Sequence, residues 1–412
     1  MSSGERLMSS DKRLMSSDKR LPSDRPRRIV VLGSTGSIGR QTLDVVERLR
    51  RIGYSLEIVG LAAGKNVELL ERQIVACTPR ACSLASPDAA ERLAREHSDL
   101  RVLHGDEGLR QLACMEDVDV IVNGLVGALG LAPTLAALSV GRTVALANKE
   151  SLVVGGDLVN ATLEAGDGRL FPLDSEHSGL FQCIEAGRRS DVARVTLTAS
   201  GGPFLRTEID RLEHVTPSDA LHHPNWSMGS RITIDSATMV NKAFEVIEAH
   251  HLFGLPYERI GAVVHPASIV HALVEYDDGS IIAQLAAHDM RIPIQYALTY
   301  PERAATDLPR LSFEEHRDLT FEPLDTARFP AFAVVLAAAE AGGSAPAAVN
   351  AADEILVSRF LSGEIPFTGI SRGLQVILDQ WEEEIDNERL TLQHLLDVDR
   401  WARDAANDIA PL

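Results

Sequence analysis

Along the first 150 residues, short continuous runs of apolar residues alternate with amphipathic stretches. The apolar run at 29–32 is followed by the stretch 39–51, in which Leu43, Val46 and Leu49 recur at helical spacing. The same alternation predicts further strands at 56–61, 81–84, 118–123 and 143–147 and further helices at 67–76 and 87–96. Because these strands lack an apolar–polar alternation of their own, they are typical of a sheet buried on both faces. The order of the elements predicts a parallel, doubly wound α/β sheet.

The pattern changes after about residue 168, where helices no longer separate the strands regularly. We expect strands at 192–198, 231–234, 260–264, 269–276 and 280–285. Asp278 and Gly279 predict a hairpin between the last two, because an Asp-Gly pair adopts the positive φ angles of a tight turn. This region is typical of an α+β domain with a partly antiparallel sheet.

The rest of the chain predicts a linker and a helical region. Residues 301–325 are rich in proline and charge and have no clear period, whereas the sequence from Phe329 is rich in alanine and predicts about four helices. We therefore expect a disordered tail at 1–27, an α/β domain at 28–165, an α+β domain at 166–300, a linker at 301–328 and an α-helical domain at 329–412.

The N-terminal tail repeats the heptads MSSGERL, MSSDKRL and MSSDKRL, so Met8 and Met15 are alternative candidate start residues. It has no apolar segment, and its acidic residues argue against a transit peptide. The most apolar stretch of the chain, 118–138, contains Asp119 and Pro133. It fits a buried strand and turn better than a membrane span, so we expect no membrane partner.

Composition narrows the classes of function. The 412 residues include 59 acidic and 40 basic ones, and the formal net charge of −19 argues against nucleic acid as a partner. Four cysteines without metal-binding spacing favour reduced thiols and a cytoplasmic location. Two of the five lysines lie in the tail, so the body of the chain holds only Lys65, Lys149 and Lys242. An acidic chain this poor in lysine makes each of these three a candidate for binding an anionic ligand.

The turn Gly33-Ser-Thr-Gly36-Ser-Ile-Gly39 lies between a predicted strand and a predicted helix. This is the position of a dinucleotide-binding turn, although a glycine-rich turn with only a packing role remains an alternative. The second strand ends in Ala63-Gly64-Lys65-Asn66, without the acidic residue that binds the ribose of NAD. The lysine therefore favours NADP over NAD.

Three further segments combine acidic and polar residues after predicted strands: 148–151, 174–177 and 235–245. We expect Asp174 and Glu176 to point the same way from an extended segment. With a third carboxylate they would form an all-oxygen site suited to Mg²⁺ or Mn²⁺, although two acids in a solvated turn are the commoner alternative. Lys149 and Lys242 lie inside these segments, which favours the ligand-binding interpretation.

Two loops have the composition of ligand-binding segments. Ser200-Gly-Gly-Pro203 is a small-residue turn that suits a phosphate. The segment 221–229 mixes polar residues with Trp226 and Met228, which is typical of a lid that excludes water, although a loop packed into the core by Trp226 is the alternative.

Seven motifs together resemble the 1-deoxy-D-xylulose 5-phosphate reductoisomerase family. They are GSTGSIG at 33–39, AGKN at 63–66, ANKES at 147–151, LDSEH at 173–177, SGGPF at 200–204, HPNWSMG at 223–229 and DSATMVNKAFEVIEA at 235–249. The resemblance runs from about residue 28 to Ala352. The sequence departs from the family pattern at Ala243, Ala267 and Asp353, where the family more often has Gly, Gln and Asn, and none of these is a predicted ligand.

The resemblance implies an α/β homodimer with a Rossmann-like NADP-binding domain, a central α+β catalytic domain and a C-terminal α-helical domain. It implies that 1-deoxy-D-xylulose 5-phosphate rearranges on a divalent metal ion, Mn²⁺ or Mg²⁺, with Co²⁺ as a further candidate. NADPH then reduces the product to 2-C-methyl-D-erythritol 4-phosphate, on the non-mevalonate route to isoprenoids.

The resemblance also implies roles for individual residues. The metal ligands would be Asp174, Glu176 and Glu245, and the catalytic residues Lys149, Glu176 and His223. Substrate would be bound by Lys149, Ser175, Glu176, Ser200, His223, Trp226, Ser236, Asn241, Lys242 and Glu245, with its phosphate at Ser200, Ser236, Asn241 and Lys242. NADPH would contact Thr35, Gly36, Ser37, Ile38, Gly64, Lys65, Asn66, Asn148, Glu150 and Gly229.

Two other functions compete with this interpretation. Another NADP-dependent dehydrogenase of a phosphorylated or acidic metabolite would not need three carboxylates on one metal ion. A non-catalytic NADP(H)-sensing protein would be expected to have lost the charged site residues, all of which are present.

Overall fold

The computed structural model describes residues 25–222, 229–315, 318–384 and 390–410. The chain forms two compact units. The first unit comprises the chain up to Ser151 together with Val159–Ser178 and Asp289–Pro309, and the second comprises Leu152–Leu158, Gly179–His288 and Arg310–Leu412. Neither unit is a contiguous stretch of sequence.

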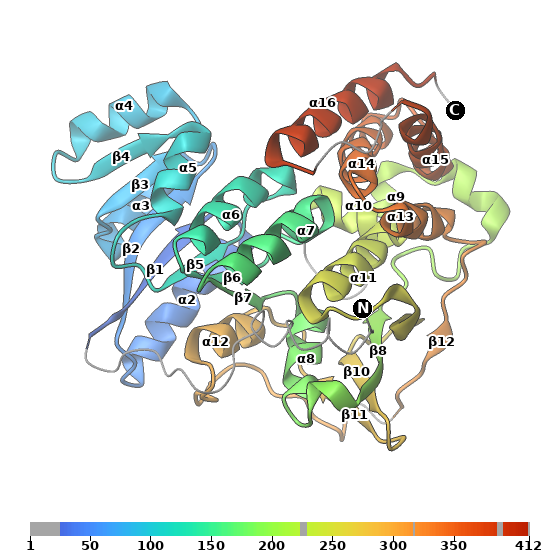
Figure 1. The fold of residues 1–412 in the computed structure, drawn as a ribbon, viewed down its shortest axis with the longest axis horizontal. Coiled ribbons are helices and arrows are strands. Elements are labelled where there is room, and N and C mark those ends of the chain that lie inside the picture. Colours follow the sequence, from blue (N-terminus) through green and yellow to red (C-terminus); the bar gives the residue numbers. More distant parts are fainter. Residues whose placement is uncertain (1–24, 223–228, 316–317, 385–389, 411–412) are drawn as a thin grey trace. The chain divides into compact units, whose positions relative to one another are not determined.

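The first unit is built on a seven-stranded sheet in the order β4-β3-β2-β1-β5-β6-β7 (Figure 1). Every neighbouring pair in it is parallel. The strands are β1 (Arg27–Leu32), β2 (Leu56–Ala63), β3 (Ala81–Leu84), β4 (Arg101–His104), β5 (Val120–Asn123), β6 (Thr143–Leu146) and β7 (Arg169–Pro172). The predicted parallel α/β fold is therefore confirmed.

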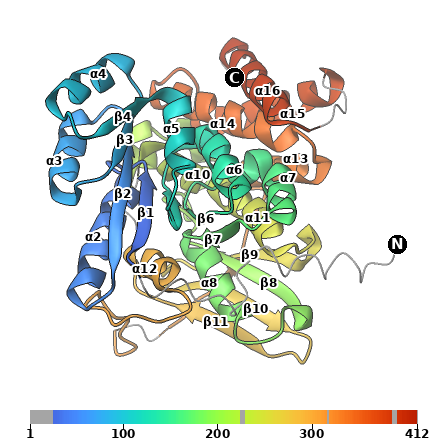
Figure 2. The ribbon, with the colours of Figure 1, turned by 60° about the vertical axis from the view of Figure 1, so that its left-hand side comes forward.

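Helices cover both faces of this sheet. Helix α2 (Ser37–Arg51) packs with α12 (Arg291–Thr299) on one face, and α5 (Gly105–Ala113) packs with α6 (Leu131–Ser139) on the other (Figure 2). Between them in the chain lie α3 (Val67–Cys77) and α4 (Pro87–Glu96), while α7 (Glu150–Ala165) and α8 (Ser175–Ile184) contain residues of both units. Because all the strands are parallel, their carboxyl ends meet at one edge, where ligands of α/β sheets bind.

The second unit contains a mixed sheet of five strands in the order β11-β10-β8-β9-β12. Strands β10 and β11 form the predicted antiparallel hairpin, and β8 pairs in parallel with β9. The strands are β8 (Val192–Ala199), β9 (Ile260–Val264), β10 (Val270–Tyr276), β11 (Ile281–Leu285) and β12 (Glu322–Pro323). Helix α11 (Val240–Phe253) packs against β8 and β9.

The C-terminal part of this unit is helical, as predicted. Its helices are α13 (Pro330–Ala341), α14 (Ala345–Leu361), α15 (Phe367–Glu384) and α16 (Leu392–Asp408). Helix α14 packs against the other three. It is buried along most of its length, which explains its alanine-rich composition, since small side chains allow close packing on several sides.

One predicted strand is wrong. The segment 231–234 belongs to helix α10 (Ser230–Thr238), not to a sheet. The β-branched residues Ile232, Thr233 and Ile234 led to the strand prediction, because such residues are enriched in strands. Tertiary packing overrides this preference: Thr233 and Ile234 are buried where α10 contacts α11 and α14.

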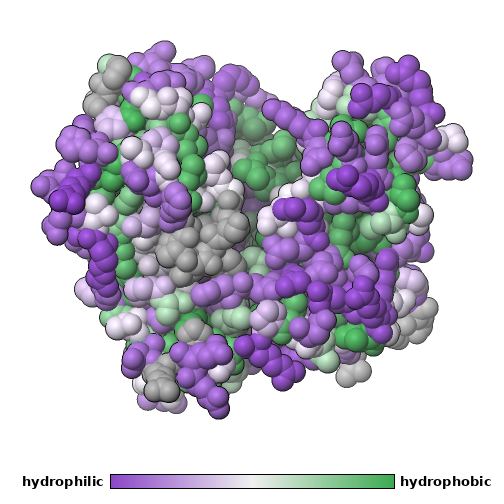
Figure 3. All heavy atoms as spheres, turned by 180° about the vertical axis from the view of Figure 1, so that it is seen from behind, coloured by the Kyte–Doolittle hydropathy of each residue, from purple (hydrophilic) through white to green (hydrophobic). Residues whose placement is uncertain are grey.

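None of the helices in the described parts of the chain is long and apolar enough to cross a lipid bilayer. Hydrophilic residues predominate on the face shown in Figure 3, with smaller hydrophobic areas between them. The segment 1–24, which includes most of the predicted tail, lies outside the described residues.

A close contact between α2 and the turn before it makes Gly39 a sensitive position. A Cβ atom there would lie 2.4 Å from both the Gly33 carbonyl oxygen and the Ser34 Cα. We expect Gly39→Ala to lower the free energy of unfolding by about 1–3 kcal/mol through overpacking, measured by thermal denaturation without cofactor. Gly64→Ala is the control, because nothing lies within 4 Å of a Cβ at Gly64. Equal stability of the two variants would contradict the prediction.

Candidate active site

The turn after β1 has the backbone geometry of an anion-binding turn. Gly33 adopts a φ of +81°, and a Cβ on it would lie 2.5 Å from the Gly124 carbonyl oxygen, so only glycine fits. Gly36 is the N-cap of α2 and offers no capping side chain. The first backbone N–H groups of α2, at Ser37 and Ile38, are therefore available to a phosphate group.

A second loop at the same sheet edge carries the predicted NADP-selecting residues. β2 pairs with β1, so Lys65 follows β2 at the edge where the glycine turn follows β1. Lys65 is exposed, while the Asn66 side chain caps α3 by accepting a hydrogen bond from the Leu69 N–H at 3.1 Å. Gln73 on α3 exchanges hydrogen bonds of 2.7 and 2.8 Å with Ser34 and so fixes the glycine turn to α3. Sequence reasoning missed Gln73, whose partner lies 39 residues away.

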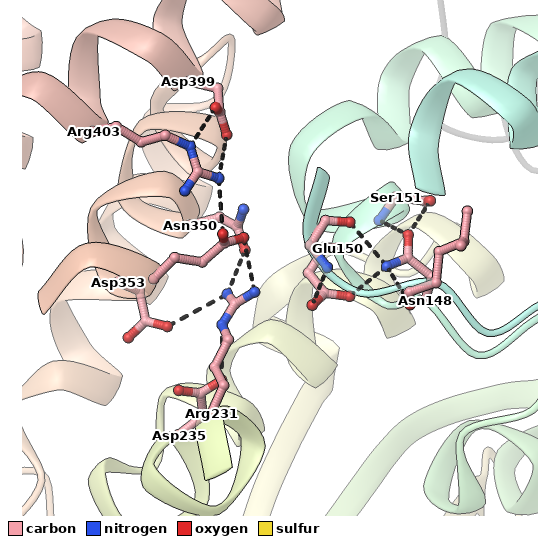
Figure 4. A network of polar contacts seen from close by, with 12 residues as sticks. Asn148, Glu150, Ser151, Arg231, Asp235, Asn350, Asp353, Asp399 and Arg403 are labelled. Atoms are coloured by element: carbon pink, nitrogen blue, oxygen red, sulfur yellow. Dashed lines mark hydrogen bonds and ion pairs between the residues drawn. The ribbon is translucent and has the colours of Figure 1, made fainter. Parts of the chain in front are cut away.

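Asn148 and Glu150, predicted to contact NADPH, hold a neighbouring loop in place (Figure 4). The Asn148 amide donates to the Leu125 and Gly127 carbonyl oxygens at 3.1 and 3.0 Å and to Glu150 at 2.7 Å. Glu150 in turn accepts from the Gly127 N–H at 3.0 Å. Both side chains therefore shape the loop after β5, and their contact with a cofactor stays a prediction.

Asp174 and Glu176 follow β7 at the carboxyl edge of the sheet, but not in the extended conformation that we predicted. Helix α8 begins at Ser175, directly after Asp174, so Glu176 lies in the first helical turn. A carboxylate is favourable at that position because it faces the positive end of the helix dipole. The Ser175 hydroxyl donates a hydrogen bond to Glu176.

Lys149 lies beside this acidic pair. Its Nζ is 2.7 Å from an Asp174 carboxylate oxygen, and the two side chains are only 10% and 14% exposed. His177 is fully buried, with Nδ1 3.9 Å from the same oxygen. His177 was not among the predicted site residues, although it stands in the LDSEH motif. The first unit thus brings two carboxylates, one lysine and one histidine together.

The second unit carries an ion pair on the first turns of α11. Lys242 pairs with Glu245, and the two side chains are 4% and 2% exposed. The Asn241 amide donates to the other Glu245 oxygen at 2.5 Å. Removing both charges of such a pair from water costs several kcal/mol, so a buried lysine–carboxylate pair is weak evidence for stability and a reason to look for a ligand.

The predicted phosphate-binding residues lie on the turn after β8, on α10 and on the first turn of α11. The turn after β8 places Gly201 and Gly202 at φ angles of +84° and +66°, and the Gly202 N–H donates to the Ser200 hydroxyl at 3.2 Å. A Cβ at Gly202 would lie 2.8 Å from the Ser236 carbonyl oxygen, so this turn packs directly on the end of α10. α11, which carries Asn241 and Lys242, begins four residues after Ser236.

Other predicted site residues are placed differently. His223 and Trp226 lie outside the described residues. Gly229 is exposed and is the N-cap residue of α10, and its carbonyl oxygen accepts a hydrogen bond from the Thr233 hydroxyl at 2.8 Å. It belongs to the second unit, whereas the other predicted NADPH contacts belong to the first.

Comparison with known sequences identifies the same family along nearly the whole chain. Residues 29–156 match the model described as 1-deoxy-D-xylulose 5-phosphate reductoisomerase. Residues 170–253 match the C-terminal domain model of that enzyme, and residues 285–405 match a further model described as DXP reductoisomerase C-terminal domain.

Individual relatives agree with these matches. The chain is 47% identical over 388 residues to a 1-deoxy-D-xylulose 5-phosphate reductoisomerase of Chlorobium chlorochromatii, covering 93% of this chain and 100% of the relative. It is 46% identical to the enzyme of the same name from Desulforamulus reducens, covering 93% and 98%.

Solved structures show the same likeness. The Zymomonas mobilis 1-deoxy-D-xylulose 5-phosphate reductoisomerase in complex with NADPH superposes with a TM-score of 0.86 at 38% identity, covering 93% of this chain and 98% of that one. A DOX-P reductoisomerase in complex with NADPH, fosmidomycin and magnesium gives 0.86 at 38% identity, covering 92% and 97%.

Proposed function

Because the chain belongs to the 1-deoxy-D-xylulose 5-phosphate reductoisomerase family, we propose that it converts 1-deoxy-D-xylulose 5-phosphate to 2-C-methyl-D-erythritol 4-phosphate. NADPH and a divalent metal ion are the proposed cofactors, since related structures contain NADPH and magnesium. The observation that carries the proposal is the placement of the lysines. Lys149 and Lys242 each face a carboxylate from the predicted metal-binding set.

The first unit fits NADPH. The Gly33 turn admits no side chain, and the start of α2 presents backbone N–H groups to a pyrophosphate. Exposed Lys65 lies at the end of β2, where a cation suits the 2′-phosphate of NADP. We assign the NADPH contacts to Thr35, Gly36, Ser37, Ile38, Gly64, Lys65, Asn66, Asn148, Glu150 and Gly229.

The carboxylates fit a hard divalent cation. Asp174 and Glu176 from the first unit and Glu245 from the second offer only oxygen donors, which suit Mg²⁺ or Mn²⁺. Lys149 and Lys242 neutralise Asp174 and Glu245 in the structure. We propose that Asp174, Glu176 and Glu245 would hold the metal ion, whose charge would then compensate these carboxylates, while Lys149 and Lys242 would contact substrate oxygens.

When bound, the metal ion supplies Lewis-acid polarisation of the substrate carbonyl, and NADPH supplies the hydride for the reduction. Lys149, Ser175 and Asn241 would orient the substrate hydroxyls. The phosphate would be held by Ser200, Ser236, Asn241 and Lys242, so that binding energy far from the reacting carbons positions them. His223 and Trp226 would close over the substrate and exclude water during hydride transfer.

We further propose that the enzyme is cytoplasmic, as its cysteine usage favours, and a homodimer, as the family resemblance implies. None of the four cysteines forms a disulfide, and burial raises the pKa of the Cys82 thiol to about 12, so this group stays protonated. Sedimentation equilibrium of the purified chain tests the dimer, and a monomer at micromolar concentration would contradict it.

Metal removal tests the proposed function. We expect NADPH to be oxidised in the presence of 1-deoxy-D-xylulose 5-phosphate and the absorbance change to stop when EDTA is added. Turnover should return with excess Mg²⁺ or Mn²⁺, because chelation removes the ion and leaves the protein intact. Mass spectrometry of the product distinguishes rearrangement from simple reduction. Turnover that persists after chelation would contradict the metal assignment, and an unrearranged product would favour an ordinary dehydrogenase.

A further inference from the structure

The turn at 200–203, which the proposed function assigns to the substrate phosphate, is held by contacts at both of its ends. Before it, the Ala199 carbonyl oxygen accepts the His265 backbone N–H at 2.7 Å, where β8 and β9 end side by side. After it, the ring of Phe204 is buried with its centroid 5.0 Å from that of Phe367 on α15. Because glycine has the greatest conformational freedom to lose, the two glycines between these ends depend on such anchors to keep their conformation.

One segment, residues 320–328, contacts both ends of the turn, and we call it the strap. The buried His265 side chain donates from Nδ1 to the Thr320 carbonyl oxygen at 2.7 Å. Its ring also stacks on Phe321, with the centroids 4.8 Å apart. The next two residues of the strap form β12, which pairs with the end of β9. The strap is therefore fixed to the strand that His265 follows.

The other end of the strap binds the chain just after the turn. A single nitrogen of Arg328, Nη1, donates to the carbonyl oxygens of Phe204, at 3.4 Å, and of Thr207. The strap residue Glu322 also pairs with Arg206, but the Arg206 side chain is 70% exposed, and an ion pair so open to solvent contributes little. Arg328 is thus the main polar contact between the strap and this loop.

The predicted phosphate ligand on α10, Ser236, is held by other contacts. Arg231 on the same helix donates to Glu354 at 2.8 Å and lies 3.5 Å from Asp353, both on α14 (Figure 4). None of these residues belongs to the strap. A change in the strap should therefore act on the glycine turn and leave α10 in place.

We propose that His265 and Arg328 are positioning residues for the substrate phosphate, which act through the strap by holding the turn at 200–203 in its binding conformation. The inference rests on the proposed function, because it takes Ser200 as a phosphate ligand. Its physical basis is preorganisation, since a turn that is already ordered loses less conformational entropy when a ligand binds. The strap, which the sequence predicts as the end of a linker, thus gains a role in the site.

Phosphate binding by Arg328→Met tests the inference. We expect titration of inorganic phosphate into the full chain with NADPH present, followed by phosphorus NMR, to give a Kd about fivefold higher than in wild type. Arg328→Lys should stay within about twofold of wild type, because one nitrogen makes both bonds and an ammonium group carries three donors. Arg206→Met is the matched control: it loses the same charge but only an exposed ion pair, and should also stay within about twofold.

Steady-state kinetics separate positioning from a loss of stability. Arg328→Met should raise the KM for 1-deoxy-D-xylulose 5-phosphate by a factor similar to that for phosphate, with kcat and the KM for NADPH unchanged. His265→Leu removes the bond to Thr320 from the other end of the strap and should have the same effect. General destabilisation would not raise one KM and leave the other as it was.

Hydrogen exchange of the wild-type protein gives a measurement that needs no variant. Because coupling between two sites is reciprocal, phosphate bound at the turn should slow backbone exchange in residues 318–330 as well as in 199–207. Residues 87–96, which form α4 in the first unit, should exchange at the same rate with and without phosphate.

Several outcomes would overturn the inference. Wild-type phosphate affinity in folded Arg328→Met or His265→Leu would do so, as would protection of 199–207 by phosphate without protection of 318–330. An equal loss in Arg206→Met would do so too, because charge alone would then explain the effect. Unchanged phosphate affinity in Ser200→Ala would remove the turn from the site. If wild-type protein binds phosphate but gives no turnover, the proposed function fails and the binding results still decide the inference.

Discussion

Replacement of Glu245 by glutamine is expected to lower kcat/KM for 1-deoxy-D-xylulose 5-phosphate by at least about 1000-fold, which corresponds to roughly 4 kcal/mol of transition-state stabilisation. Glu245 is the proposed metal ligand from the second unit, and glutamine keeps its shape while it removes the charge. The change also removes the negative charge that faces buried Lys242, so the local electrostatics alter even before a ligand binds.

Direct metal binding separates these two effects. Titration of Mn²⁺ into the protein with NADPH present should show weaker binding in Glu245→Gln, while the thermal unfolding midpoint reports any loss of fold. Glu258→Gln, which changes an exposed glutamate of the same unit, is the control and should match wild type in both measurements. Wild-type Mn²⁺ affinity in Glu245→Gln would remove Glu245 from the ligand set.

Replacement of Lys242 by arginine keeps the charge, yet it is expected to lower kcat/KM by about 100-fold. The Lys242 side chain is 4% exposed, so the larger planar guanidinium has no free space and cannot reproduce a compact ammonium contact with phosphate. We expect most of this decrease in kcat/KM to come from a higher KM, because the proposed role of Lys242 is to bind the substrate phosphate.

Lys65→Arg is the matched control for this substitution. Lys65 is exposed, and an arginine fork binds a phosphate group well, so the KM for NADPH should change by less than about threefold. Near-normal kinetics in Lys242→Arg would show that charge alone matters at that position. It would also weaken the argument that the scarce lysines of this chain are retained for their shape.

Local sequence patterns predicted those helices and strands for which the secondary structure favoured by the local sequence is also the one that tertiary packing requires. The bounds predicted for β3, α4 and β9 match the structure, because each is a short apolar or amphipathic run with clear ends. α10 was missed because its β-branched residues favour a strand in isolation, and only burial between helices reverses that preference.

The candidate site was predictable only in part, for a related reason. Lysine usage and the motifs singled out Lys149, Asp174 and Glu245; the structure shows their charged contacts, and their roles in binding stay a prediction. Asp353 and Arg231 lie 122 residues apart and carry no common local pattern, so their contact depends on the packing of α14 against α10. The boundaries of the three predicted domains stay a prediction.

The discontinuity of the two units sets an order of events during synthesis. Helix α12 packs against α2 and the strands β6 and β7, but it lies in the segment Asp289–Pro309. The core of the first unit therefore lacks α12 until about three quarters of the chain has been translated. At ordinary elongation rates this is roughly 15 to 60 s after initiation. During that interval the part of one sheet face that α12 later covers, over β6 and β7, stays exposed, and chaperone binding would be directed there.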